Sequence, residues 1–196
     1  MTLNTLAQIN SETKAEKMER MEWWTKARFG MFIHWGLYAL PARHEWVMSN
    51  EKMSKKTYEK YANYFDPDLY NPTQWAKLAK KAGMKYVVFT AKHHDGFTMY
   101  DSKYTDYKVT NTPYGKDVMK ELVDAFRAEG IRIGLYYSLI DWHHPDFLVK
   151  DPIHPEKNNK KELAKDSSRD LKKFQKYLKN QLTEILTNYG QIDILF

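Results

Sequence analysis

The sequence contains no cysteine among its 196 residues. Disulfide bridges and thiolate metal sites are therefore excluded, and the redox compartment stays undefined. No apolar stretch approaches the roughly 20 residues that a transmembrane helix needs. Residues 1–22 are polar and charged and lack the apolar core of a signal peptide. We therefore expect no membrane span and no signal peptide in this chain, which leaves its localisation open between the cytoplasm and secretion with the leader removed.

The sequence also lacks the motifs of nucleic-acid-binding proteins. It has no zinc-ligand spacing, no RNP-like run and no helix-turn-helix punctuation. The net charge of +6 comes from lysines that are scattered along the chain rather than gathered on one element. Such a distribution is typical of a solvated basic surface. We therefore expect no nucleic-acid partner.

Hydrophobic residues make up 42% of the chain, which is enough for a packed core in one large domain or in part of a bigger one. Short apolar runs predict buried strands near residues 28–35, 84–91, 131–137 and 191–196. The segments between them predict helices, one of which has an apolar face made by Trp75, Leu78, Ala79 and Ala82. Glycines at positions 83, 130 and 190 close these helices just before the next strand begins.

This alternation of helix, glycine and apolar strand is the signature of βαβ units and a parallel sheet. The fold class is therefore α/β, and four such strands indicate the N-terminal half of a (β/α)8 barrel, which typically needs ~250 residues. A doubly wound open sheet is the competing fold, but it would carry a glycine-rich loop after its first strand, where this chain has His34-Trp35-Gly36. We assign residues 1–26 to a charged helical segment and residues 27–196 to the partial barrel.

Polar and titratable residues follow three of the predicted strands. His34 ends the first strand, His93, His94 and Asp95 end the second, and Tyr136, Tyr137, Asp141, Trp142, His143 and His144 lie at or after the end of the third. Since the carboxyl ends of parallel strands meet at one rim, these side chains should lie together.

Two chemistries fit a rim rich in histidine. The first is a metal-dependent hydrolase, but no His-x-His or HExxH spacing occurs, and neighbouring strand residues such as His93 and His94 point to opposite faces unless the strand has already ended. The second is recognition of a polyhydroxylated ligand, because neutral imidazoles and tyrosine hydroxyls exchange hydrogen bonds with sugar hydroxyls. Glu45 and the rings of Trp35, Trp46, Trp142 and Phe196 would complete a sugar site.

Several of these motifs resemble one known family. The segments Arg28–Gly36, Glu45-Trp46, Lys92–Phe97 and Leu135–Ser138 closely resemble α-L-fucosidases of glycoside hydrolase family 29, and the resemblance extends from about residue 22 to residue 196. It implies a retaining exo-glycosidase that removes terminal α-L-fucosyl residues, built on an irregular (β/α)8-like barrel followed by a β-sandwich domain. No cofactor is implied, and the implied ligands are fucosides and fucosylated glycans.

The resemblance also implies roles for individual residues. The substrate-binding residues would be His34, Glu45, Trp46, His93, His94, Tyr136 and Phe196, with Tyr137 as the alternative to Tyr136. The nucleophilic aspartate of the family would come two residues beyond Phe196, and the general acid/base farther downstream, so we expect no catalytic residue within this chain. Asp193 lies at the start of its strand and is not the nucleophile.

These expectations leave three functions open for the chain. It is the N-terminal half of an α-L-fucosidase, inactive by itself; a non-catalytic fucose-binding or interaction half-barrel; or a metal-dependent hydrolase. A half-barrel leaves a strand edge and apolar helix faces uncovered. We therefore expect either self-association or pairing with the missing C-terminal half.

Overall fold

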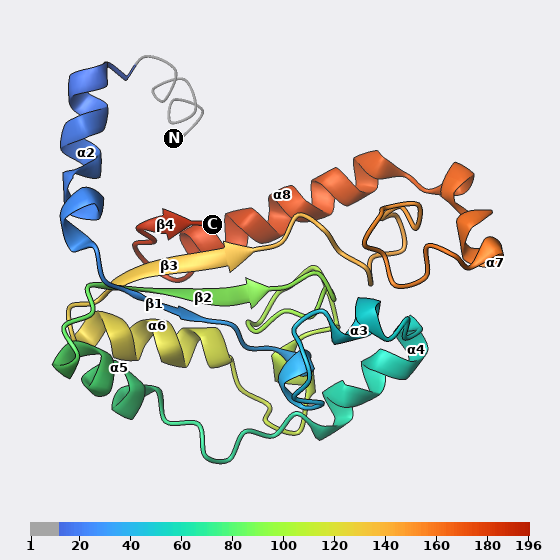
Figure 1. The fold of residues 1–196 in the computed structure, drawn as a ribbon, viewed down its shortest axis with the longest axis horizontal. Coiled ribbons are helices and arrows are strands. Elements are labelled where there is room, and N and C mark those ends of the chain that lie inside the picture. The colour runs from blue at the N-terminus through green and yellow to red at the C-terminus, as the bar shows by residue number, and fades with distance from the viewer. Residues whose placement is uncertain (1–11) are drawn as a thin grey trace.

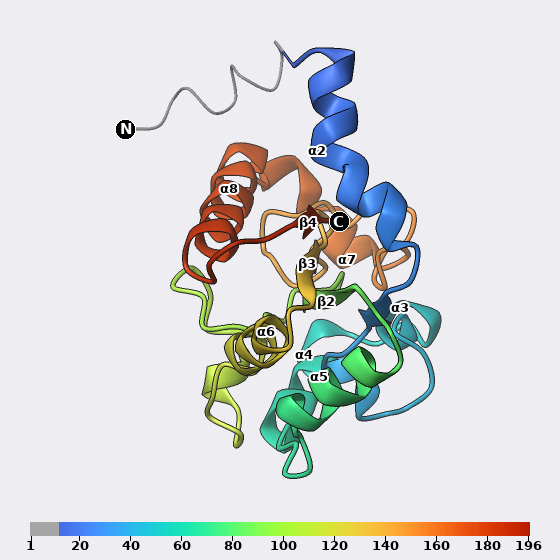
Figure 2. The same cartoon turned by 90° about the vertical axis from the view of Figure 1, so that its left-hand side faces the viewer.

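The computed structural model describes residues 12–196, which form a curved parallel sheet with helices along its outer side (Figures 1 and 2). The strands are β1 (Met31–Ile33), β2 (Tyr86–Lys92), β3 (Arg132–Tyr137) and β4 (Ile194–Leu195). The helices are α2 (Lys14–Ala27), α3 (Val47–Asn50), α4 (Lys55–Tyr58), α5 (Pro72–Lys81), α6 (Val118–Ala128), α7 (Lys160–Leu163) and α8 (Leu171–Thr187). Short 3-10 turns occur at Leu37–Ala39, Glu59–Tyr64, Val109–Asn111 and Asp166–Ser168.

All strand pairs are parallel, and the strand order in the sheet, β1-β2-β3-β4, is the order along the chain. Figure 2 shows α8, α6 and α5 following one another around the outside of the strands. The predicted α/β architecture of four parallel strands with intervening helices is therefore confirmed. The rim at the carboxyl ends of the strands carries α3, α4 and α7 with their connecting loops, at the right of Figure 1.

Local signals in the sequence explain why the main helices begin and end where they do. The side chains of Asn71, Asp117 and Asp170 accept hydrogen bonds from the first-turn amides of α5, α6 and α8. Gly83, Gly130 and Gly190 follow these helices with φ values between +71° and +87°, which a residue with a Cβ adopts only at a cost.

The outer strands are shorter than the sequence indicates. Residues 28–35 and 191–196 are predicted as strands, whereas β1 and β4 extend only over Met31–Ile33 and Ile194–Leu195. Among residues 12–196, each of these strands has a neighbour on one side alone, so fewer backbone hydrogen bonds hold it. The pairing of β4 nevertheless continues to Phe196, whose amide donates to Leu135 O at 2.9 Å.

The core lies between the sheet and the helices, and it differs from the predicted helix faces at one point. Val87, Phe89 and Leu135 are fully buried against the helical layer, as is Ala76 of α5. The sequence predicts Leu78 on the apolar face of α5, but this side chain is 58% exposed because Ala76 and Ala79 make the close approach to the core instead. The small side chains allow α5 to pack tightly beside α6.

The N-terminal segment forms a helix only in part of the range expected. The sequence predicts a helix over about 5–26, and α2 occupies Lys14–Ala27, with residues 5–11 outside the described part of the chain. None of the described side chains of α2 is buried, and the helix projects from the end of the sheet opposite the rim (Figure 1). Across residues 12–196, no helix combines the length and the apolar character needed to cross a membrane.

Candidate functional site

The predicted site residues lie at the rim formed by the carboxyl ends of the strands. His34 follows β1, His93 and His94 follow β2, Tyr136 lies near the end of β3, and Phe196 follows β4. Trp46 is the residue directly before α3. We use the term rim cluster for the side chains of Phe32, His34, Trp46, His93, His94, Tyr136, Trp142 and Phe196.

Three side chains from different strands form the centre of the rim cluster. The ring centroids of His34 and His93 are 5.3 Å apart, and that of Tyr136 is 5.7 Å from His34 and 5.5 Å from His93. Phe32 stacks on His34 at 4.7 Å, and Phe196 lies 5.7 Å from Tyr136. Aromatic rings and hydrogen-bonding side chains are therefore interleaved in one cluster, a composition that suits binding of a sugar.

His94 extends this cluster toward the loop that follows β1. The rings of His93 and His94 are 4.4 Å apart. His94 also lies 5.3 Å from the Trp46 ring and 5.4 Å from the Trp142 ring, so the indoles border one side of the rim cluster. Glu45 stands next to Trp46 in the chain with its side chain 38% exposed.

A β-bulge places His93 on the inner side of the barrel. Thr90 pairs with Tyr136 and Lys92 pairs with Tyr137, so two steps along β2 correspond to one step along β3. The extra residue shifts the alternation of side chains along β2. Lys92 therefore lies with Tyr137 on the side of the sheet that faces the helices, and His93 lies with Tyr136 on the inner side. Strict alternation places His93 and His94 on opposite faces, but β2 has ended at Lys92, and the two rings lie together.

Thr90, to which no sequence motif points, fixes the backbone beside His34. Its hydroxyl oxygen accepts a hydrogen bond from Trp35 N at 2.9 Å and donates to Trp35 O at 2.7 Å. Both backbone groups of the residue after His34 are thus held by the neighbouring strand. The Trp35 ring itself packs against Phe65, Tyr70 and Trp75, away from the rim cluster, so the prediction that it forms a wall of the sugar site is wrong.

The histidines of the rim cluster are neutral around pH 7. Burial lowers the pKa of His93 to about 2, and the neighbouring imidazoles of His94 and His34 lower it further. Burial also lowers the pKa of His94 to about 4. Burial lowers the pKa of His34, while the carboxylate of Glu45 opposes this shift. Neutral imidazoles can both donate and accept hydrogen bonds, which suits recognition of hydroxyl groups.

Two buried carboxylates, those of Asp141 and Asp95, are engaged in the scaffold behind the rim cluster. Lys92 Nζ lies 2.9 Å from Asp141 Oδ2, and both side chains are buried. Burial would raise the pKa of Asp141, but the Lys92 ammonium holds it below its usual range. Asp95 accepts a hydrogen bond from Tyr58 OH at 2.8 Å, and burial raises its pKa to about 6. Unlike these two carboxylates, Glu45 is open to solvent.

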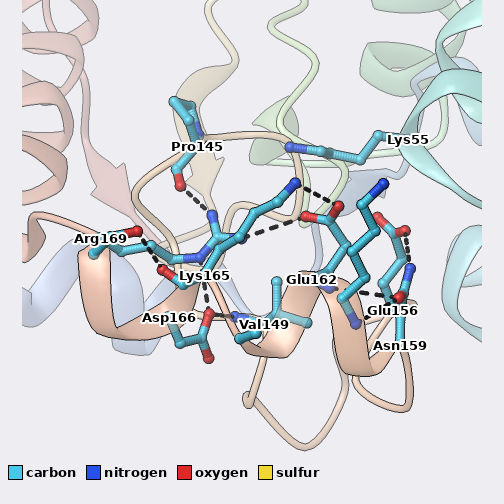
Figure 3. A network of polar contacts seen from close by, with 12 residues as sticks. Lys55, Pro145, Val149, Glu156, Asn159, Glu162, Lys165, Asp166 and Arg169 are labelled. Carbon is cyan, nitrogen blue, oxygen red and sulfur yellow. Dashed lines mark hydrogen bonds and ion pairs between the residues drawn. The ribbon is translucent and has the colours of Figure 1, made fainter.

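A polar network holds the long loop between β3 and α8 (Figure 3). The same loop carries Trp142 of the rim cluster. Arg169 donates to Asp166 Oδ1 at 2.8 Å and to Pro145 O, and Asp166 Oδ1 also accepts from Val149 N at 2.9 Å. Lys55 Nζ donates to His143 O at 3.1 Å and so ties the loop to α4. Ser49 Oγ of α3 donates to Ile153 O at 2.7 Å, so the loop is also held against the helix that follows Glu45 and Trp46.

Two histidines expected at the rim point elsewhere. The ring of His143 stacks on Tyr107 at 4.1 Å and pairs with Glu59 at 2.9 Å, and His144 contacts Phe174 and Tyr177 of α8. Within residues 12–196, no group of three or more histidine or acidic side chains is arranged to hold a metal ion. Asp193 contacts Arg132 at the start of β3, at the opposite end of the sheet from the rim cluster, as the sequence predicts.

Comparisons with known proteins agree on one family. The family model described as α-L-fucosidase matches residues 3–196. Human plasma α-L-fucosidase is 36% identical to this chain over 144 residues, which cover 64% of this chain and 31% of the human protein.

Solved structures extend the similarity to the fold. α-L-Fucosidase isoenzyme 1 from Paenibacillus thiaminolyticus shares 54% identity with a TM-score of 0.88, covering 91% of this chain and 42% of that one. The α-L-fucosidase AlfC from Lactobacillus casei, in complex with α-L-fucose product, shares 32% identity with a TM-score of 0.82, covering 91% of this chain and 60% of that one.

The chain thus spans about a third of the length of the human protein that it matches, and less than two thirds of the length of either solved relative. The similarity covers almost all of residues 12–196, and it confirms that the four strands correspond to the first part of a (β/α)8 catalytic domain. The chain belongs to the α-L-fucosidases of glycoside hydrolase family 29.

Proposed function

We propose that this chain forms the fucose-binding half of an α-L-fucosidase catalytic domain, a retaining exo-glycosidase acting on terminal α-L-fucosyl residues of glycans. The observation that carries the proposal is the rim cluster, in which imidazole, phenol and indole rings from strand ends and from the start of α3 have centroids 5.3–5.5 Å apart. A relative 32% identical to this chain is known in complex with α-L-fucose.

Each part of the rim cluster has a role in this proposal. His34, His93 and His94 exchange hydrogen bonds with the sugar hydroxyls, and Tyr136 adds a phenol hydroxyl. Trp46 and Phe196 present apolar faces to the sugar ring, and Glu45 accepts hydrogen bonds from two hydroxyls. These contacts accelerate the reaction only to the extent that they strengthen at the oxocarbenium-like transition state.

The bond-breaking groups belong to another part of the enzyme in this proposal. Retaining hydrolysis proceeds through a covalent glycosyl–aspartate intermediate and needs two carboxyl groups flanking the scissile bond. Asp95 and Asp141 are buried and held by Tyr58 and Lys92, so neither is free to act. We assign the nucleophile to an aspartate two residues beyond Phe196 and the acid/base to a position farther downstream.

Hydrolysis of an aryl α-L-fucoside tests this division of roles. A polypeptide of residues 1–196 alone is expected to show no turnover above the buffer blank. In a polypeptide that carries the complete catalytic domain, His34→Ala or His94→Ala should lower kcat/KM at least ~10-fold, the loss of about one strong hydrogen bond at the transition state. His144→Ala is the matched control, because this histidine contacts α8 and should leave kcat/KM unchanged. Unchanged kinetics in both rim variants would refute the assignment.

Fucose binding without turnover is the second candidate for the 196-residue chain itself. It is favoured by the engagement of Asp95 and Asp141 in the scaffold, which leaves the rim cluster equipped for binding alone. Calorimetric titration with L-fucose separates the two candidates: heat of binding without hydrolysis supports the second. Turnover by this polypeptide would support catalysis within the chain instead.

The exposed edges of the sheet support the proposal that a partner completes this structure. β1 and β4 each have one neighbouring strand among the described residues, and Phe32, Leu195 and Phe196 are 42–67% exposed. Such edges are covered either by the remaining strands of the barrel or by a second copy of the chain. Sedimentation of residues 1–196 should therefore show self-association that increases with concentration, and a stable monomer at high concentration would contradict this.

A further inference from the structure

Ser138, which no role described above includes, makes three hydrogen-bonding contacts directly behind His94. Its hydroxyl oxygen lies 2.6 Å from His94 Nδ1. The same oxygen lies 2.7 Å from Ile140 O and 3.0 Å from Ile140 N. Ser138 is buried, so water does not compete for these contacts. The hydroxyl therefore has to divide one proton and two lone pairs among three partners.

Only one distribution of protons satisfies all three contacts. The carbonyl oxygen of Ile140 can only accept, so the single hydroxyl proton of Ser138 points to it. The Ile140 amide can only donate, and it uses one lone pair of the hydroxyl oxygen. The remaining lone pair faces His94 Nδ1, which must then carry a proton. If Ser138 donated its proton to His94 Nδ1 instead, a lone pair of the Ser138 oxygen would face a lone pair of the Ile140 carbonyl oxygen 2.7 Å away. The hydrogen bond between these two atoms would then be lost.

The backbone around Ser138 holds this arrangement in place. Ser138 N donates to Lys92 O at 3.0 Å, and Trp142 N donates to His94 O at 2.7 Å. Two backbone hydrogen bonds therefore join the segment with Ser138 to the segment with His94. The imidazole is also flanked by the Trp46 and Trp142 rings, which limit its rotation. The contact between Ser138 and His94 is thus preorganised rather than dependent on a ligand.

We propose that Ser138 is a positioning residue that fixes His94 in the Nδ1–H tautomer, so that His94 Nε2 accepts a hydrogen bond from a hydroxyl of the bound sugar. Nε2 makes no hydrogen bond to any of residues 12–196, and the side chain is partly exposed. In this tautomer Nε2 has a lone pair and no proton, so it discriminates in favour of a donor at that point of the ligand. The identification of the donor as a sugar hydroxyl rests on the proposed function, whereas the assignment of the His94 tautomer does not.

Nitrogen NMR of the 196-residue chain tests the tautomer without any activity assay. Long-range proton–nitrogen correlation of the imidazoles at neutral pH, with His94 assigned by its loss in His94→Gln, should show a protonated Nδ1 and an unprotonated Nε2. Ser138→Ala removes the acceptor, and the signals should shift toward the Nε2–H form that free histidine prefers. Ser138→Thr keeps the hydroxyl and should keep the Nδ1–H form. A protonated Nε2 in the unsubstituted chain would overturn the proposal outright.

Titration with L-fucose in the same experiment tests the acceptor role. Addition of L-fucose should move the His94 Nε2 resonance, whereas methyl α-D-glucopyranoside should not. Ser138→Ala should weaken L-fucose binding about tenfold, the equivalent of one hydrogen bond, and Ser138→Thr should stay within about twofold. An Nδ1–H tautomer together with an Nε2 signal unmoved by L-fucose would overturn the acceptor role and the proposed fucose site, while the positioning by Ser138 would stand.

Discussion

The buried ion pair between Lys92 and Asp141 gives the sharpest prediction for stability. The two side chains are 0% and 1% exposed, and Asp141 also accepts hydrogen bonds from His143 N and His144 N. In Lys92→Met the chain keeps a side chain of similar length between the Tyr137 and Tyr177 rings, but Asp141 loses its counter-charge. An uncompensated buried carboxylate costs about 3–5 kcal/mol of unfolding free energy.

This loss is large compared with the ~5–15 kcal/mol that stabilises a typical domain. For a chain of this size it corresponds to a decrease in Tm of roughly 6–20 °C. Urea unfolding followed by circular dichroism, with calorimetry for Tm, measures both quantities. Lys120→Met is the matched control: its partner Asp124 lies 2.5 Å away, but both side chains are more than half exposed, so we expect a loss below about 0.5 kcal/mol.

A double-mutant cycle isolates the pairing itself. Asp141→Asn removes the charge and keeps an oxygen that can accept from the two amides. The double variant Lys92→Met/Asp141→Asn should be about 2 kcal/mol more stable than the sum of the single losses predicts, because neither partner is left alone. A loss below 1 kcal/mol in Lys92→Met, or additive losses in the cycle, would show that the pair does not carry the stability assigned to it.

Two further predictions concern the loop that follows β2. Gly96 has a φ of +80°, and a Cβ added there would collide with Asp141 Oδ1. Gly83 has a similar φ of +87° but open space around it, so Gly96→Ala should lower the free energy of unfolding by about 1–3 kcal/mol more than Gly83→Ala does. Equal losses of the two variants in urea unfolding would exclude the collision as the cause. His93 is buried with its pKa lowered from 6.5 to about 2, so the unfolded chain binds the additional proton and stability should fall as the pH drops below 6.5. His93→Gln should flatten the dependence of the urea midpoint on pH between 6.5 and 4, and an unchanged slope would contradict this cause.

The fold could be predicted largely from local signals. The caps Asn71 and Asp117 and the helix-ending glycines mark the main helices, since each supplies a hydrogen bond or a backbone conformation that its neighbours cannot. The exposure of Leu78 could not be predicted, because periodicity alone does not tell whether a leucine or a smaller neighbouring alanine approaches the core.

The candidate site was predictable only in outline. The position of His34, His93 and Tyr136 at strand ends could be inferred, since parallel strands deliver their carboxyl ends to one rim. The roles of Thr90 and Ser138 could not, because each depends on a contact with a residue more than 40 positions away in the chain. The sequence misplaces Trp35 for the same reason, because its packing against Phe65 and Trp75 depends on tertiary contacts.

The extra residue in β2 determines what substitutions near residues 90–92 would do to the two sides of the sheet. Because of it, adjacent residues serve opposite sides of the sheet: the Lys92 ammonium stabilises the outer layer while the His93 imidazole faces inward. A substitution that favoured regular pairing over residues 90–92 would exchange these environments. It would turn the Lys92 amine toward the rim cluster and leave Asp141 opposite a neutral ring, so the rim cluster and the buried ion pair would be disrupted together rather than separately.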